Sequence, residues 1–411
     1  MLGMLLCALL AVPADVLTVN DDGGAQFLTI QAAIDAAAPG DVIEVQPGSY
    51  AAFTLAKSLT LLGPAADTPP VIVSGQSNVY GTGDTTLAGL TLHRLRLADV
   101  TGLVQVDDCT VGPAPGAGYF PAPAFDVVRC ARVLATRCTI TGPAGQPNLD
   151  GSPALLAEHS SVQVVDCVLN AGDGGHADEA FEYGGSGGDG ISAVASQLGI
   201  SASSVRGGDA GYGTYFGGSD GYAGDGLQAS AGCTVVLRGE PGDVLKAGYA
   251  DTSFGGTPGY AARLSNTVLV VSGVALPDAA IKLGVGCSVS KPVPAEPWLV
   301  VTGSDLPGQS RLVELHGVPG QVAVLFGGLR AGLVQLPGWD SPFWLVPTNA
   351  LLILPLVLDA GGTANFPIAL PVASGLDGAA LLLQPAFPGV PSALVPGKAL
   401  LGNPANLVLR F

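Results

Sequence analysis

The chain has 411 residues, of which 60 are Gly and 32 are Pro, and only 12% carry a charge. A hydrophobic content of 48% excludes an intrinsically disordered chain, because that much apolar surface can offset the entropy lost on folding. The net charge of -17 excludes nucleic-acid binding through a basic face. The many Gly and Pro residues show no collagen period, so they predict turns between short strands rather than long helices.

The acidic residues are concentrated in the first part of the chain. Residues 1–264 hold 26 acids and 10 bases, whereas residues 265–411 hold 7 acids and 6 bases. This difference predicts two regions of different character.

The N-terminus predicts export. Residues 1–14 form an apolar run that ends in small residues before Asp15, as in a secretory signal peptide, although a basic start is missing. We therefore expect a secreted or cell-surface protein, with no membrane-spanning segment in the mature chain because no other apolar run is long enough. Six cysteines remain after residue 14. An even number permits disulfides in an exported protein, but the spacings contain no metal motif and favour buried free thiols.

A repeat of 29 residues runs through the first region. Two sets of residues recur at this step: Val104, Val133 and Val162, and Cys109, Cys138 and Cys167. At a step of 36, Gly188-Asp189-Gly190 matches Gly224-Asp225-Gly226. Apolar residues alternate within each copy, which predicts strands, and a unit this small must stack on its neighbours to bury its apolar face. A parallel β-helix satisfies this requirement, whereas the blades of a propeller are longer.

The start of the first region carries a family resemblance. The segment QFLTIQAAIDAAAPGDVIEVQPGSY, residues 26–50, resembles the N-terminal signature of right-handed parallel β-helix proteins of the pectin-lyase-like superfamily. Ile30, Ala33, Ile34 and Ala37 would lie on one face of a short helix and cover the open apolar end of the solenoid. The resemblance extends over residues 15 to about 270 and concerns the fold far more than the activity.

These patterns predict an all-β protein in two parts. Residues 15–272 would form a right-handed parallel β-helix with an N-terminal capping helix. Residues 273–297 read as a Pro-rich linker, and short apolar runs separated by turns predict a small antiparallel β-sandwich over residues 298–411.

The most unusual segment is residues 172–226, with 18 Gly, eight acids and a single base, Arg206. It holds two long turns at the same point of neighbouring coils, which should therefore lie side by side. Aromatic rings beside carboxylates suit sugars. The predicted ligand-binding residues are Tyr183, Tyr212, Tyr215, Tyr222 and Glu182.

The same segment suits Ca²⁺, because carboxylate and carbonyl oxygens on flexible backbone are its usual ligands. The predicted calcium ligands are Asp173, Asp178, Asp189, Asp209, Asp220 and Asp225. A simpler interpretation needs no ligand: these Asp side chains bond to local backbone in the turns.

Catalysis is the alternative interpretation of the acidic turns. Asp189 and Asp225 should lie on adjacent coils about 5 Å apart, where they would share a proton or a cation. With Arg206 they are the catalytic candidates for a polysaccharide lyase or glycoside hydrolase. The resemblance implies a polygalacturonase-like pattern, but its Asn-Thr-Asp and Arg-x-Lys elements are absent.

The leading hypothesis is therefore an exported or cell-surface protein without catalytic activity, which binds polysaccharide or a cell-surface glycan through the acidic, Tyr-bearing turns. A polysaccharide lyase or glycoside hydrolase is the alternative, and a rigid structural spacer is the third interpretation.

Overall fold

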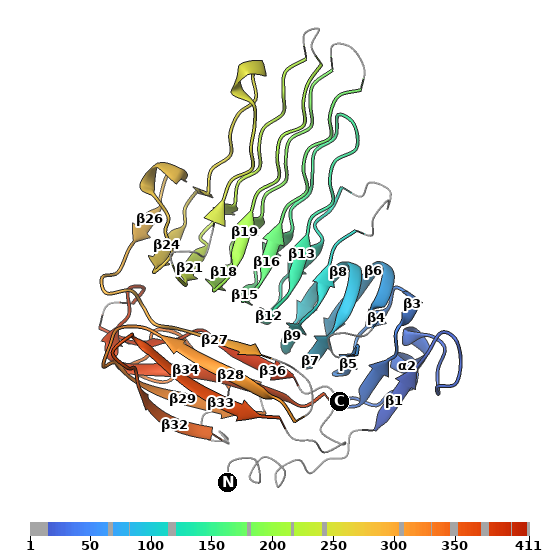
Figure 1. Cartoon of the computed structure of the whole chain (residues 1–411), viewed down its shortest axis with the longest axis vertical. Helices are drawn as coiled ribbons and strands as arrows, with labels where there is room; N and C mark the ends of the chain where they lie inside the picture. The colour runs from blue at the N-terminus through green and yellow to red at the C-terminus, as the bar shows by residue number, and fades with distance from the viewer. Residues whose placement is uncertain are drawn as a thin grey trace.

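The computed structural model describes residues 15–64, 69–81, 83–113, 121–178, 182–214, 218–240, 245–303, 308–329, 331–345, 352–370, 378–395 and 397–408. Two parallel sheets form the first part of the chain, and antiparallel sheets form the second part (Figure 1). The predicted all-β, two-part architecture is confirmed.

The first sheet of the β-helix contains one strand from each coil. Its register pairs Val104 with Val133 and Val133 with Val162, so the 29-residue repeat is one turn of the solenoid. The valines are fully buried because alternate residues of each strand face the interior. In spatial order the strands are β1 (Val16–Val19), β2 (Val42–Val45), β5 (Thr60–Leu62), β7 (Thr85–Ala88), β9 (Leu103–Asp107), β12 (Arg132–Thr136), β15 (Ser161–Val165), β18 (Gln197–Ser201), β21 (Thr234–Arg238), β24 (Val268–Ser272) and β26 (Ser288–Ser290).

The second sheet divides into two branches. Two long strands, β6 (Val71–Gly81) and β8 (Leu90–Val100), bend around two sides of the solenoid. One end of β8 pairs with β10 and the other with β11, and each branch then continues coil by coil. The strands of the first branch are β10 (Thr110–Val111), β13 (Thr139–Thr141), β16 (Val168–Asn170), β19 (Ser204–Arg206) and β22 (Leu245–Lys246). Those of the second are β11 (Phe125–Val128), β14 (Leu155–Glu158), β17 (Ile191–Val194), β20 (Leu227–Ser230), β23 (Ala262–Leu264) and β25 (Ile281–Leu283). The short strands β3 (Gly48–Ala51) and β4 (Thr54–Leu55) pair with β6.

The predicted capping helix is confirmed as α2 (Ile30–Ala36), which begins at the N-cap Thr29. Ile30, Ala33 and Ile34 are buried in the solenoid core. Lys57 Nζ donates to the carbonyl oxygens at the helix C-terminus, which completes the cap. Among the described residues, no helix reaches the length and apolarity that crossing a membrane would require.

The repeated cysteines lie inside the solenoid as free thiols. Each of Cys109, Cys138 and Cys167 follows a residue with positive φ and is at most 2% exposed. Burial strongly raises the pKa of the Cys138 thiol, so the ladder is an unreactive apolar filling.

The C-terminal part is a sandwich of antiparallel sheets, as predicted. Its core joins Leu299 and Val313 of one sheet to Leu325, Leu383 and Phe387 of the other. One sheet contains β27 (Trp298–Gly303), β28 (Ser310–His316) and β33 (Thr363–Ala369). The other contains β32 (Leu352–Val357), β29 (Val322–Gly328), β34 (Ala380–Pro391), β35 (Ala399–Leu401) and β36 (Ala405–Val408). A small hairpin adds β30 (Ala331–Val334) and β31 (Phe343–Leu345).

The sandwich packs against the outer face of the first sheet. Trp344 and Leu382 contact Leu103, Leu134 and Val165 in one apolar cluster. Within the range 273–297, predicted as a linker, β25 and β26 extend both sheets of the β-helix. Glu296 in the same range is 3% exposed and is paired with Arg238.

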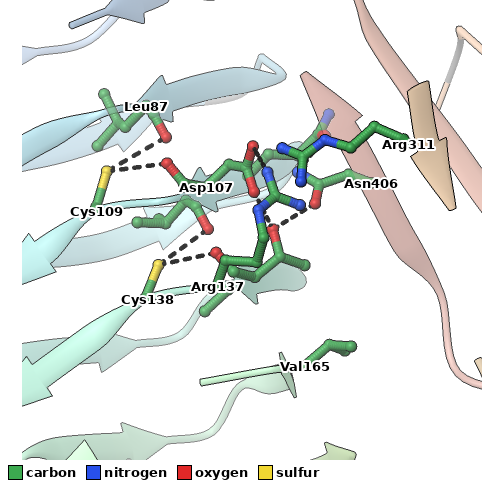
Figure 2. Close-up of polar contacts among 12 residues, drawn as sticks. Leu87, Asp107, Cys109, Arg137, Cys138, Val165, Arg311 and Asn406 are labelled. Carbon is green, nitrogen blue, oxygen red and sulfur yellow. Dashed lines mark hydrogen bonds and ion pairs between the residues drawn. The ribbon is translucent and has the colours of Figure 1, made fainter. Parts of the chain in front are cut away.

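A buried polar cluster lies in this contact between the two parts (Figure 2). Asp107 of β9 is fully buried, with Thr136 Oγ1 and Arg137 Nη2 each 2.5 Å from its carboxylate. The Thr136 hydroxyl also contacts Asn406 of the C-terminal strand β36, whose amide donates to Gln105 Oε1 at 3.1 Å. Buried polar groups of both parts therefore satisfy one another.

Candidate functional site

Four long loops project side by side from the β-helix, at the point where the second sheet divides (Figure 1). They connect β13 to β14, β16 to β17, β19 to β20 and β22 to β23. We call their described residues, 142–154, 171–178, 182–190, 207–214, 218–226 and 247–261, the loop stack. The two acidic turns predicted to lie together are its second and third loops, so this prediction is confirmed.

Glycine gives the loop stack its structure. The Gly188 N–H donates to the Gly172 carbonyl, Gly208 to Gly188, and Gly224 to Gly208, at 2.8–2.9 Å. Other N–H groups donate to carbonyl oxygens of the next loop, as the Gly174 N–H does to the Asp209 carbonyl at 2.8 Å. Each loop is thus bonded to its own return segment and to its neighbour.

Close approach, not positive φ, explains why these residues are glycines. A Cβ on Gly208 would lie 2.0 Å from the Gly172 oxygen, and one on Gly224 only 1.8 Å from the Gly188 oxygen. A spacing of three residues recurs in each segment, between Gly172 and Gly175, Gly185 and Gly188, Gly208 and Gly211, and Gly221 and Gly224. Three residues per turn is the period of an extended polyproline II helix, which has no internal hydrogen bonds and so bonds to its neighbours.

The acidic side chains cap backbone N–H groups of the following loop. Asp189 Oδ1 accepts from the Asp225 N–H at 3.0 Å, and Asp225 Oδ1 accepts from the Tyr260 N–H at 2.7 Å. The same contact recurs in three further pairs, from Asp150 to Ser186, Asp173 to Asp209 and Asp209 to Tyr249. Most of the predicted metal or catalytic carboxylates therefore have a structural partner, but these five bonds reach the following loop rather than the local backbone that the simpler interpretation of the Gly-Asp turns expected.

The structure brings Asp189 and Asp225 together, but it places Arg206 elsewhere. Arg206 Nη2 pairs with Asp209 Oδ1 at 2.5 Å. The base beside the carboxylate pair is Arg263 of β23, whose guanidinium bonds to Asp225. Burial raises the pKa of Asp189 to about 6, with the nearby Asp225 charge adding to the effect. Sequence reasoning missed Arg263 because its strand lies beyond the acidic turns.

The predicted calcium ligands do not gather at one point in the described part of the chain. No group of three or more His, Cys, Asp or Glu side chains there is arranged to hold a metal ion. Asp220, for example, turns back to accept from the Gly213 N–H at 2.8 Å. Ca²⁺ binding stays a prediction.

Tyrosine rings are the exposed feature of the loop stack. Tyr183, Tyr212 and Tyr222 are between 50% and 66% exposed, and Tyr212 stacks on His176 with ring centroids 4.9 Å apart. Tyr215 lies outside the described residues. Glu182 accepts a hydrogen bond from Asn148 of the preceding loop, so its carboxylate joins two loops.

The structure adds Tyr249 to this set, with 61% of the residue exposed. A signal for it is present in the sequence, because Gly-Tyr-Ala occurs at 221–223, 248–250 and 259–261. The last copy contains Tyr260, which lies under the charged ends of Arg263 and Lys282.

No family model matches the chain, and the comparison with curated proteins also finds no match. Among solved structures, it is similar to the enzymatically active domain of tailspike protein 2 of bacteriophage CBA120. The identity is 12% and the TM-score 0.28, over 95% of this chain and 75% of that one. The pectin methylesterase of Aspergillus niger is 16% identical with a TM-score of 0.25, over 70% and 90% of the two chains. The A-module of a mannuronan C-5 epimerase from Azotobacter vinelandii is 16% identical with a TM-score of 0.24, over 64% and 94%.

These TM-scores are low, so the fold assignment rests on the strand pairing of this chain. Strands of successive coils pair in parallel in both sheets, and parallel crossovers of this kind are right-handed in nearly all proteins. The chain is a right-handed parallel β-helix protein with a small C-terminal β-domain.

Proposed function

We propose that this protein binds carbohydrate without turning it over, through the exposed tyrosines of the loop stack. The observation that carries the proposal is a set of half to two-thirds exposed rings, Tyr183, Tyr212, Tyr222 and Tyr249, on a closely bonded backbone. Aromatic side chains that gather on one exposed surface are typical of interaction sites. The CH faces of a sugar stack on such rings, and the carboxylates of the loop stack accept hydrogen bonds from its hydroxyl groups.

Rigidity supports binding by these tyrosines. Gly-to-Gly hydrogen bonds and Asp-to-backbone contacts join the loops, so the backbone that carries the tyrosines loses little conformational freedom when a ligand binds. Repetition along the stack also favours a long polymer over a single small molecule, because several sugar rings can contact several tyrosines at once.

Retention of the protein on immobilised polysaccharides tests the proposal. We expect Tyr222→Ala and Tyr249→Ala each to weaken binding about fivefold to tenfold, since an aromatic contact contributes about 1 kcal/mol. Tyr80→Ala is the matched control, because Tyr80 is 48% exposed but lies on β6, outside the loop stack. Equal retention of all three variants and the wild-type chain would exclude binding through the stack.

One observation favours the catalytic alternative, a polysaccharide lyase or glycoside hydrolase. A carboxyl with a pKa of about 6, Asp189, suits a general acid near neutral pH, and Asp225 and Arg263 are close to it. Incubation with acidic and neutral polysaccharides, followed by measurement of unsaturated products and reducing ends, separates the two functions. Turnover that disappears in Asp189→Asn would replace the binding proposal with catalysis.

Export follows as part of the proposal, because polysaccharide and cell-surface glycans lie outside the cell. Residues 1–14 are outside the described residues, and the signal peptide stays a prediction. N-terminal sequencing of protein recovered from the medium should give Asp15 as its first residue. Protein that remains inside the cell with residues 1–14 attached would contradict export. If the protein neither binds nor cleaves any of the polysaccharides, the structural spacer is the interpretation that remains.

A further inference from the structure

A cleft of about 160 Å³ lies between the β-helix and the sandwich, away from the loop stack. Its floor includes Gln163 of β15 and Gly199 of β18 on the outer face of the first sheet. Asp340 and Trp344 of the sandwich lie on the opposite side. Clefts between domains are common places for small-molecule sites.

The cleft exists because one row of outward side chains is interrupted. Across the first sheet the row runs Leu134, Gln163, Gly199 and Val236. At Leu134 the sandwich is in direct contact through Trp344. At Gly199 there is no side chain to fill the space. A Cβ there would lie 2.0 Å from Gln163 Oε1, so the Gln163 side chain extends over the glycine.

The polar groups of the cleft select the ligand. Gln163 Oε1 is buried and accepts no hydrogen bond from any described residue, so a ligand donor would satisfy it. Arg238 is the cation among the described lining residues, and it is paired with Glu296 at 3.0 Å. An anionic ligand would be repelled by the carboxylate of Asp340, and Arg238 is already paired, so no free cation would balance the ligand's charge. The cleft therefore suits a neutral ligand that carries hydrogen-bond donors.

We propose that this cleft binds one small neutral polyhydroxy unit, such as a monosaccharide. Its volume of about 160 Å³ leaves room for one sugar ring. When the Gln163 amide turns from Gly199 toward the cleft, one ligand hydroxyl donates to its Oε1, and the CH face of the ring lies against Trp344. This site is separate from the tyrosines, so it stands or fails independently of the proposed function.

Fluorine NMR of the full chain, labelled with 5-fluorotryptophan, tests the cleft. The chain has three tryptophans, and Trp344→Phe assigns the signal of Trp344. Glucose, galactose and N-acetylglucosamine are titrated separately. At least one of them should shift the Trp344 signal saturably. Gln163→Met keeps the side-chain volume but loses the acceptor, and we expect about threefold to tenfold weaker binding. Gly199→Ala should abolish binding, because its methyl group forces the Gln163 side chain into the cleft.

Two variants serve as controls. Gln228→Met makes the same change at an exposed position on β20, and Tyr222→Ala alters the loop stack, so both should bind like the wild-type chain. The proposal is overturned if none of the three sugars gives a saturable shift. It is overturned equally if Gln163→Met and Gly199→Ala keep the wild-type affinity while their three fluorine signals remain dispersed as in the folded chain.

Discussion

Asp189 makes a hydrogen bond that supports the fold, but its charged form is destabilised by burial. Its Oδ1 caps the Asp225 N–H, yet its surroundings disfavour the charged form and raise its pKa to about 6. A carboxyl whose pKa is higher in the folded than in the unfolded chain binds more protons when folded. The stability that it contributes is therefore fully present below pH 3.8, the ordinary pKa of the carboxyl, and is lost as the pH rises through about 6.

Asp189→Asn should remove this pH dependence. Asparagine keeps an oxygen that can accept the Asp225 N–H, and it carries no charge to desolvate. We expect the variant to match the wild-type stability near pH 3 and to exceed it above pH 6, with a gain in the free energy of unfolding of at most about 3 kcal/mol. Thermal melts from pH 3 to 8 measure the difference.

Asp173→Asn is the control for this substitution. Asp173 makes the same contact, to the Asp209 N–H, from an exposed position where solvent screens its charge. No gain is expected there above pH 6. A gain of equal size in both variants would show that net charge, and not burial at Asp189, governs the pH dependence.

At the scale of elements, the loop stack depends on glycine at its contact points. Gly208→Ala should destabilise the protein by about 1–3 kcal/mol, because the new Cβ would lie 2.0 Å from the Gly172 oxygen, a backbone atom that the Gly188 N–H holds in place. Melting temperature and retention on polysaccharide should fall together. Gly389→Ala is the control, since a Cβ there meets no atom within 4 Å. A Gly208→Ala variant with unchanged melting temperature and retention would contradict this role of glycine in the loop stack.

The β-helix could be predicted from sequence because its signal is local and repeated. Val104, Val133 and Val162 occupy equivalent strand positions, and the capping helix follows from the spacing of Ile30, Ala33 and Ile34. The glycines of the loop stack carry a period of three, which a search for strands and helices does not detect. The sequence suggested ligands for the acids because the N–H partners of Asp173, Asp189, Asp209 and Asp225 lie in the next loop.

Contacts between the two parts of the molecule had no sequence signal. Asp107 and Asn406 are 299 residues apart, and each lies in an ordinary strand. The sequence marks residues 273–297 as rich in Pro, a composition typical of linkers. Nothing in that composition reveals that Glu296 is buried against Arg238, or that the sandwich covers part of the first sheet. Tertiary burial of this kind depends on the whole structure.

At the scale of the whole molecule, the buried cluster around Asp107 couples the sandwich to the β-helix. Asp107→Ala leaves Arg137 without its buried carboxylate, so we expect a loss of about 3–5 kcal/mol. The sandwich should then become more sensitive to proteolysis, because its Asn406 contacts the same cluster through Thr136. Asp99→Ala removes an exposed pair with Arg129 and should leave melting and proteolysis unchanged. If Asp107→Ala lowered the melting temperature without exposing the sandwich to protease, the cluster would stabilise the β-helix alone.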